Sequence, residues 1–304
     1  MNSDNSKHVV RQHDSARIKR ITQSIIGLPT LPTVVSKMLE MIDNPRTSAS
    51  TLARLISTDQ ALTAKILKLA NSAYYGFSRE ISTVNMAIVV LGFNTVKDMG
   101  LWLSVFDVFK KSSDSNSFDI VRFWEHSVAC GIAARMVARN TQSRYAGEAF
   151  VAGLLHDIGK VVLNQYFNKD FLEILQKAQE SSLEDAEKEI LGIGHGRIGA
   201  WLAEKWNLPS MISETILHHH QPWESKKEQD FVAIITLADL LCHLTETGNS
   251  GRAVVPVYDE RLWEIFVNSG FPIDESDLER LQTDFFIEYE RSETFLSMIN
   301  EGSS

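Results

Sequence analysis

A histidine and an aspartate stand side by side inside an apolar stretch of the chain, at His156 and Asp157. The residues at 150–155 and 158–163 are almost all apolar, as in a segment that lies in a protein core. An imidazole and a carboxylate are costly to bury there unless something satisfies them. A divalent metal would satisfy both, because neutral imidazole and ionised carboxylate are common ligands. The alternative is a buried histidine bonded to a carbonyl oxygen, with Asp157 capping a turn.

Apolar residues recur at helical spacing along the chain, and no segment shows the alternation of a half-buried strand. The first clear instance is Leu31, Val34, Val35, Met38, Leu39 and Ile42. The same spacing predicts helices at about 118–140, 147–164, 183–205, 211–219, 231–244 and 275–300. We therefore expect an all-α fold with essentially no β-sheet.

The best internal boundary is a polar, serine-rich segment at 110–116. It divides the chain into a flexible arm over 1–20, an N-terminal helical lobe over 21–110, a second helical lobe over 117–244 and a C-terminal helical extension over 245–304. In the last predicted helix we expect four side chains to dock on the bundle: Leu281, Phe285, Phe286 and Tyr289.

Charge and composition exclude several classes of protein. The net charge of −9 disfavours binding to nucleic acid. Cys130 and Cys242 both lie in apolar helical patterns, so reduced core thiols are favoured over a disulfide. No apolar run reaches the roughly 18 residues that span a bilayer, and residues 1–13 are polar, unlike a signal peptide. A cytoplasmic protein that does not enter a membrane is expected.

Further histidines and acids lie beside apolar helical faces elsewhere in the chain. Asp239 stands in the middle of the apolar segment at 231–244, where a carboxylate needs a cation or hydrogen-bond donors. A local pair with His243 is the alternative there. His126 and His195 are weak indications alone, and a packed core histidine is the simpler interpretation of His126.

A second cluster, His218-His219-His220, ends a predicted helix, and at least one of the three is expected to have no role. A helix bundle can bring such separate segments to one centre. About six nitrogen and oxygen ligands, with no cysteine required, suit one or two ions of Fe, Mn, Ni, Mg or Zn. Asp157 could bridge two metals, which would generate hydroxide near neutral pH and hold a phosphate. Lys160 could contact a phosphate oxygen, although an exposed helix lysine is the simpler interpretation.

The pattern of His126, His156-Asp157 and Asp239 resembles the H…HD…D pattern of the HD phosphohydrolase superfamily. The segment from Leu28 to about Pro222 resembles the HDOD family of bacterial signalling proteins. Four stretches carry this second resemblance: Leu28-Pro29-Thr30-Leu31-Pro32, Asp59-Gln60-Ala61-Leu62-Thr63, Ala70-Asn71-Ser72-Ala73-Tyr74-Tyr75 and Ala87-Ile88-Val89-Val90-Leu91-Gly92. The resemblance implies an all-α fold whose second lobe is HD-like.

A wider resemblance is to the HD-GYP phosphodiesterases, which hydrolyse cyclic di-GMP. His156-Asp157-Ile158-Gly159-Lys160 is similar to their HDIGK run, and His195, His219-His220 and Asp239 match their later motifs. Two departures stand out. Gln221-Pro222-Trp223 replaces the Gly-Tyr-Pro segment, which makes cyclic di-GMP a doubtful substrate. Arg122 replaces a glutamate of some trinuclear members, which leaves two metals as the maximum.

The cost of burying polar groups, together with the resemblance to the HD-type motifs, predicts that seven residues converge on one metal centre: His126, His156, Asp157, His195, His219, His220 and Asp239. HDOD proteins are generally thought to have lost catalysis. The favoured function is therefore a signal-transduction module that binds partner signalling proteins and retains an HD-type metal site. The alternative is a metal-dependent phosphodiesterase or phosphohydrolase that acts on a nucleotide or cyclic dinucleotide, which would then be a further ligand.

Overall fold

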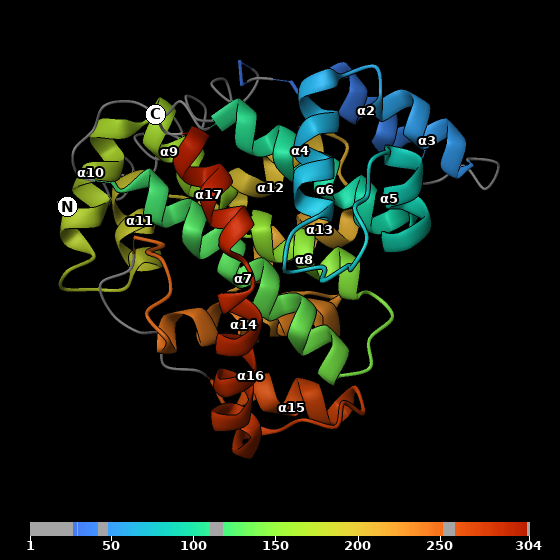
Figure 1. Cartoon of the computed structure of the whole chain (residues 1–304). Coiled ribbons are helices and arrows are strands. Elements are labelled where there is room, and N and C mark those ends of the chain that lie inside the picture. The colour runs from blue at the N-terminus through green and yellow to red at the C-terminus, as the bar shows by residue number, and fades with distance from the viewer. Residues whose placement is uncertain (1–26, 29, 42–47, 110–117, 252–258, 303–304) are drawn as a thin grey trace, which may run out of the picture.

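The computed structural model describes residues 27–28, 30–41, 48–109, 118–251 and 259–302, and every regular element in these ranges is a helix (Figure 1). The predicted all-α fold is confirmed. The expected arm at 1–20 and the boundary at 110–116 lie outside the described residues, so the division into lobes stays a prediction. In the described part of the chain, no helix has both the length and the apolar character needed to cross a membrane.

The N-terminal helices are α2 (Thr33–Glu40), α3 (Ala49–Ile56), α4 (Gln60–Ala70), α5 (Val84–Leu91) and α6 (Phe93–Phe109). Side-chain oxygens of Ser48, Asp59 and Thr83 cap the starts of α3, α4 and α5, as these residue types commonly do. Helices α2 to α5 all pack on α6, or on a neighbour that does, and α6 also contacts α8. Helix α6 therefore connects the N-terminal helices to α8.

The middle of the chain folds around α7. Its elements are α7 (Ile120–Asn140), α8 (Ala146–Leu155), α9 (Ile158–Tyr166), α10 (Asn168–Lys177), α11 (Leu183–Leu191), α12 (His195–Lys205), α13 (Ser210–His218), η1 (Pro222–Glu224) and α14 (Gln229–Leu244). Helix α7 packs closely on α8 and α14. A Cβ atom at Gly153 of α8 would lie only 2.6 Å from the carbonyl oxygen of Cys130 on α7, so a glycine is needed for this approach.

Two segments that were predicted as single helices are each broken in two. The predicted helix at 147–164 is divided into α8 and α9 by His156 and Asp157, and the backbone of Asp157 leaves the helical region at φ −102° and ψ 11°. The predicted helix at 183–205 ends at Gly192, which takes the left-handed conformation with φ 75°. Helix α12 then begins at His195. Both breaks lie beside the candidate ligands, which places polar side chains at helix ends.

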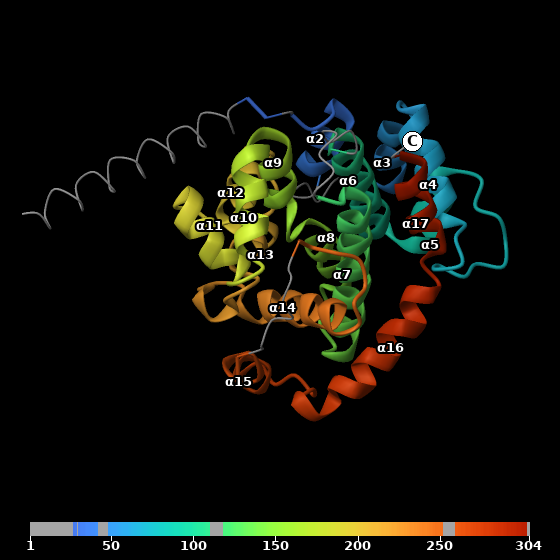
Figure 2. The same ribbon diagram turned by 90° about the vertical axis from the view of Figure 1, so that its left-hand side faces the viewer.

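The C-terminal extension consists of α15 (Arg261–Asn268), η2 (Glu275–Asp277), α16 (Leu278–Glu290) and α17 (Glu293–Gly302). Figure 2 shows α16 running along the outside of the molecule toward α17, which lies beside α4. Helix α16 packs on α7 and α14, and α17 packs on α7 and α4. Phe295 of α17 meets Tyr74 edge-on at a centroid distance of 5.4 Å and Phe150 at 5.7 Å. The C-terminal helices therefore contact both the N-terminal helices and the helices around α7.

The predicted docking of the C-terminal helix holds for three of its four side chains. Leu281 and Phe285 are buried, and Tyr289 is partly buried against the core. The prediction is wrong for Phe286, which is 57% exposed. Successive helical residues are turned by about 100° from one another, so Phe285 and Phe286 cannot both face α7. The predicted helix at 275–300 is also interrupted, between α16 and α17.

These neighbouring phenylalanines provide a matched pair for testing the docking of α16. Phe285→Ala is expected to lower the free energy of unfolding by about 3–5 kcal/mol, because it empties a site that is 1% exposed. Phe286→Ala should change it by no more than about 0.5 kcal/mol. Urea unfolding followed by circular dichroism measures both. Equal effects of the two substitutions would contradict the docking of α16.

Candidate metal centre

His156 and Asp157 occupy the break between α8 and α9, and both are fully buried. The Nδ1 atom of His156 donates to the carbonyl oxygen of Gly153 at 2.6 Å. This bond turns the other ring nitrogen, Nε2, toward two carboxylates. His156 Nε2 lies 3.3 Å from Oδ2 of Asp157 and 3.6 Å from Oδ1 of Asp239.

A first group of candidate ligands comes from α7, the α8–α9 break and α14. His126 Nε2 lies 3.0 Å from Oδ1 of Asp239, and its ring centroid is 5.4 Å from that of His156. His126, His156 and Asp157 offer ligand atoms within 4.8 Å of one another. All of these side chains are buried. This group therefore lies where α7, α8 and α14 pack together.

A second group surrounds the other side of Asp157. Oδ1 of Asp157 lies 3.1 Å from Nε2 of His195, at the start of α12, and 3.3 Å from Nε2 of His219, just after α13. Nε2 of His220 lies 3.0 Å from Nε2 of His195. Asp157, His195, His219 and His220 also have ligand atoms within 4.8 Å of one another. Asp157 therefore belongs to both groups, and the structure brings all seven predicted residues together.

Hydrogen bonds from the protein fix the orientation of the imidazoles in the second group. Both carboxylate oxygens of Glu187 lie 2.8 Å from Nδ1 of His195, and one accepts the backbone N–H of His195 at 2.9 Å. Nδ1 of His219 donates to the carbonyl oxygen of Ile216 at 3.0 Å. Such partners fix the tautomer and leave Nε2 for a metal.

Glu187 is a residue that the sequence interpretation missed. It is fully buried on α11, on the same face as Leu183, Ile190 and Leu191. A carboxylate on an apolar helical face is the signal that drew attention to Asp239, and it was present at Glu187 as well. The missing information was its partner, because a contact across the α11–α12 break depends on a turn at Gly192 that was not predicted.

Four ligand atoms of the centre are buried, and each lies 3.0–3.3 Å from a nitrogen or oxygen of a neighbouring side chain, but none of them is aligned for a hydrogen bond among the described residues. They are Nε2 of His126, Nε2 of His156, Oδ1 of Asp157 and Oδ1 of Asp239. Orphaned polar atoms of this kind are rare in proteins, and each needs an explanation. These four atoms are imidazole nitrogens and carboxylate oxygens, which is the donor set of a divalent cation. The residues therefore fit a metal that would complete their bonding.

The electrostatics of the centre keep its carboxylates ionised and His219 neutral, whereas burial at His156 is outweighed by Asp157, which holds the pKa of that imidazole well above its ordinary value. Burial alone would raise the pKa of Asp157, but His156 and Lys160 hold it well below the usual range. Burial is likewise outweighed at Asp239, where His243 and His126 keep the carboxyl pKa well below its ordinary value. Burial lowers the pKa of His219 to about 4. Ionised carboxylates therefore face at least one neutral imidazole at neutral pH.

Lys160 does not lie on the surface. It is fully buried on α9, and its Nζ atom donates to Oδ2 of Asp157 at 2.6 Å. The interpretation of Lys160 as an exposed helix lysine is therefore wrong. Its suggested contact with a phosphate stays a prediction, and the structure places its ammonium group beside the shared carboxylate.

Two further residues adjoin the first group, and one histidine lies apart. Nε2 of His243 is 3.3 Å from Oδ1 of Asp239, so the local pair foreseen as an alternative is present in addition to the contact with His126. Cys130 offers its sulfur within 4.8 Å of ligand atoms of His156 and Asp239. His218 instead faces Glu214 and Glu224 at 3.9 and 4.0 Å. At least one histidine of the run at 218–220 was expected to have no role, and His218 is the one that lies apart from the centre.

The role of Glu187 can be tested with a neighbour on the same helix. Glu187→Gln is expected to weaken the affinity for Mn²⁺ or Zn²⁺ by about 10–100-fold, because it disturbs the partner that orients His195. Glu189→Gln, at an exposed position two residues later, is the control and should leave the affinity unchanged. Competition with a chromogenic chelator measures both. Equal affinities of Glu187→Gln and the wild type would contradict this role.

Comparison with known proteins gives the chain its relatives. The model of the HDOD domain matches residues 28–222. An uncharacterized protein of Treponema pallidum (strain Nichols) is 25% identical over 224 residues, which are 72% of this chain and 43% of the relative. The chain thus spans less than half the length of that relative.

Solved structures show the same fold. An HDOD domain protein of unknown function from Geobacter sulfurreducens is 27% identical, with a TM-score of 0.77 over 92% of this chain and 97% of the other. A provisionally named phosphohydrolase from Shewanella amazonensis SB2B has a TM-score of 0.70 and 23% identity, over 90% of this chain and 97% of the other. A provisionally named signal transduction protein from Marinobacter aquaeolei VT8 has a TM-score of 0.74 and 22% identity, over 96% of this chain and 66% of the other. With a family match over most of its length and the H…HD…D residues gathered at one centre, the chain belongs to the HDOD family.

Proposed function

We propose that this protein is a signal-transduction module of the HDOD type, which holds one or two divalent metal ions at the HD centre and binds partner signalling proteins. The observation that carries the metal part is the set of four buried ligand atoms without hydrogen-bond partners among the described residues. A site kept for packing alone would leave these atoms at a cost of about 1–3 kcal/mol each.

The two groups of ligands assign the residues to the ions. His126, His156 and Asp157, with Asp239 at 3.0 Å from His126 and 3.6 Å from His156, would hold one ion, and Asp157, His195, His219 and His220 would hold the other. The many imidazoles favour Fe, Mn, Ni or Zn over Mg, which prefers oxygen ligands. Glu187 and the carbonyl oxygens of Gly153 and Ile216 orient the imidazoles.

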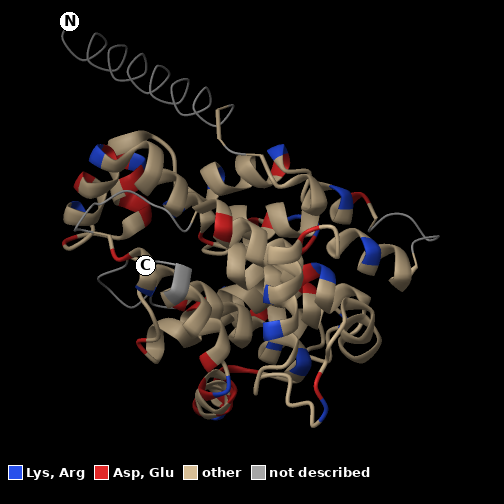
Figure 3. Ribbon diagram, turned by 45° about the horizontal axis from the view of Figure 1, so that its top comes forward, with Lys and Arg blue, Asp and Glu red and all other residues tan. Residues whose placement is uncertain are grey.

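Binding of partner proteins is supported by the surface of the helices. Large apolar side chains are exposed at Phe77 in the α4–α5 loop, at Val89 on α5, and at Val267, Phe286 and Ile287 in the C-terminal helices. Figure 3 shows lysine and arginine interspersed with aspartate and glutamate on many helices. With a net charge of −9, this mixture supports proteins over nucleic acid as partners.

A second candidate function is the hydrolysis of a phosphodiester at the same centre. The observation that favours it is the position of Asp157 between both ligand groups. When two divalent metals are bound, such a site polarises a phosphoryl group and lowers the pKa of an attacking water. His220 and His243 are only partly buried, and a substrate would approach the centre past them. The ammonium group of Lys160 would then neutralise charge on the phosphoryl oxygens.

Metal binding is tested by removing each carboxylate. Asp157→Ala and Asp239→Ala are expected to lose bound metal in elemental analysis of protein purified without chelator. Their melting curves should no longer respond to added Mn²⁺, which in the wild type adds about 2.7 kcal/mol at a free concentration 100-fold above Kd. Asp284→Ala, on the surface of α16, is the control and should behave as the wild type. A wild type that takes up no divalent metal would end this proposal.

Hydrolysis is tested separately through Lys160. If the centre is an enzyme, Lys160→Met should lower the turnover of bis(p-nitrophenyl) phosphate by about a hundredfold while the bound metal stays, because Lys160 would contact phosphate and not metal. Methionine keeps the apolar stem in the core. Lys188→Met, at an exposed position on α11, is the control. Loss of metal from Lys160→Met would contradict the role, and absence of turnover in metal-loaded wild type would leave only the signalling function.

A further inference from the structure

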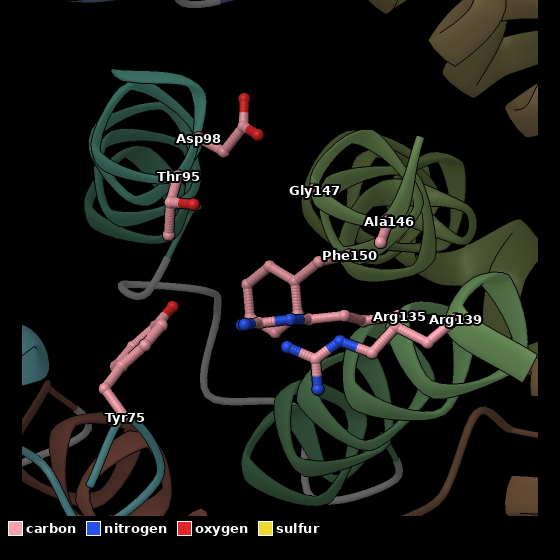
Figure 4. A pocket seen from close by; sticks show the side chains of 8 residues that line it. All are labelled: Tyr75, Thr95, Asp98, Arg135, Arg139, Ala146, Gly147 and Phe150. Carbon is pink, nitrogen blue, oxygen red and sulfur yellow. The ribbon is translucent and has the colours of Figure 1, made fainter. Parts of the chain in front are cut away.

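A pocket of about 180 Å³ lies between α6, α7 and α8 and shares no residue with the metal centre. Figure 4 shows it from close by, with Arg135 and Arg139 reaching in from α7 and Tyr75 facing them. Thr95 of α6 also lines it. The pocket therefore lies where the N-terminal helices meet α7 and α8, and nothing in the proposed metal function uses it.

Two guanidinium groups provide the positive charge of the pocket. Arg135 and Arg139 are four residues apart on α7, so both project from the same face of the helix. Arg135 lies over the rings of Tyr74 and Tyr75, at 5.3 and 5.4 Å from their centroids, which fixes its side chain. Arg139 is about half exposed and forms a long ion pair of 3.7 Å with Glu288 of α16. Paired guanidinium groups are suited to a phosphate, which they bind through parallel N–H donors.

A buried carboxylate provides the opposite wall. Asp98 is 5% exposed, and its Oδ1 atom lies 3.3 Å from Nζ of Lys97. Its other oxygen, Oδ2, is buried without a hydrogen-bond partner among the described residues. Burial raises the pKa of Asp98 to about 6, although Lys97 opposes the change. An acceptor in this position needs a donor, and a hydroxyl or amino group of a ligand would supply it.

A glycine keeps the space beside this carboxylate open. Gly147 lies on α8 at the wall of the pocket, and a Cβ atom there would be 3.3 Å from Oδ2 of Asp98. This distance is tighter than ordinary van der Waals contact. A methyl group at position 147 would therefore occupy the place from which a ligand donor reaches Asp98. Because Gly147 lies within a helix, alanine there is compatible with the backbone and favours the helix.

We propose that this pocket binds a small phosphate monoester that also carries a hydroxyl or amino donor. The phosphate lies between Arg135 and Arg139, and the donor bonds to Oδ2 of Asp98. The hydroxyl groups of Thr95 and Tyr75 are further partners at the wall. The volume is below that of typical pockets for drug-sized ligands, about 300–1,000 Å³, so a sugar phosphate fits better than a dinucleotide.

Calorimetric titration of the full chain tests the proposal, with ribose 5-phosphate, inorganic phosphate and ribose as probes. Ribose 5-phosphate is expected to bind the wild type about tenfold more tightly than inorganic phosphate, and ribose alone should bind least. Arg139→Gln and Gly147→Ala should each lower the affinity for ribose 5-phosphate by about tenfold or more, which is the effect of losing one charge-assisted hydrogen bond. Arg144→Gln, an exposed arginine that does not line the pocket, is the matched control and should bind as the wild type.

The metal centre is a second place where a phosphate could bind, and Asp239→Ala separates the two. Binding that persists in Asp239→Ala but is lost in Arg139→Gln supports the pocket, even if the proposed metal function fails. Binding that is lost in Asp239→Ala and kept in Arg139→Gln would assign the phosphate to the metal centre and overturn the proposal. Failure of ribose 5-phosphate to bind the wild type at millimolar concentration would overturn it as well.

Discussion

The buried carboxylate of Asp157 is the constraint on which the rest of the site depends. It is enclosed by Nε2 of His156, His195 and His219 and by Nζ of Lys160, all within 2.6–3.3 Å. A charge in the core is tolerated only with partners of this kind. The helix breaks at this residue, where the backbone of Asp157 leaves the helical region. The α8–α9 break lets one carboxylate face both groups of histidines.

Close helix contacts bring those groups within reach. Helices α7 and α8 approach at Gly153, which sets His126 opposite His156. Helices α9 and α12 approach at Gly159, where any Cβ atom would collide with the carbonyl oxygen of His195. Each contact holds a ligand-bearing segment against Asp157 through backbone packing, so the imidazoles are positioned before any metal binds. Pre-organisation of this kind is what a strong metal site needs, because loosely held ligands cost affinity.

Much of the architecture could be predicted from the sequence, because helical periodicity is a local property of the chain. The seven residues that the structure gathers were also predicted, from the cost of burying polar groups on apolar faces together with the resemblance to HD-type ligand patterns. Features that depend on contacts between distant segments could not be predicted from the sequence. The breaks at Asp157 and Gly192 interrupt sequences with good helical periodicity. The burial of Lys160 and the pairing of Glu187 with His195 follow from those breaks. The exposure of Phe286 reflects a helical face that α7 does not reach.

The central claim is that divalent metal binds at Asp157, between the two groups of histidines. Anomalous X-ray diffraction from crystals grown with Mn²⁺, recorded on both sides of the metal absorption edge, locates such ions directly. We expect one or two anomalous peaks at roughly 2.0–2.3 Å from the carboxylate of Asp157 and from Nε2 of the neighbouring histidines. Well-ordered crystals from Mn²⁺-containing solution with no peak at Asp157 would contradict the account. The seven residues would then form a hydrogen-bonded network in a protein that binds its partners without metal.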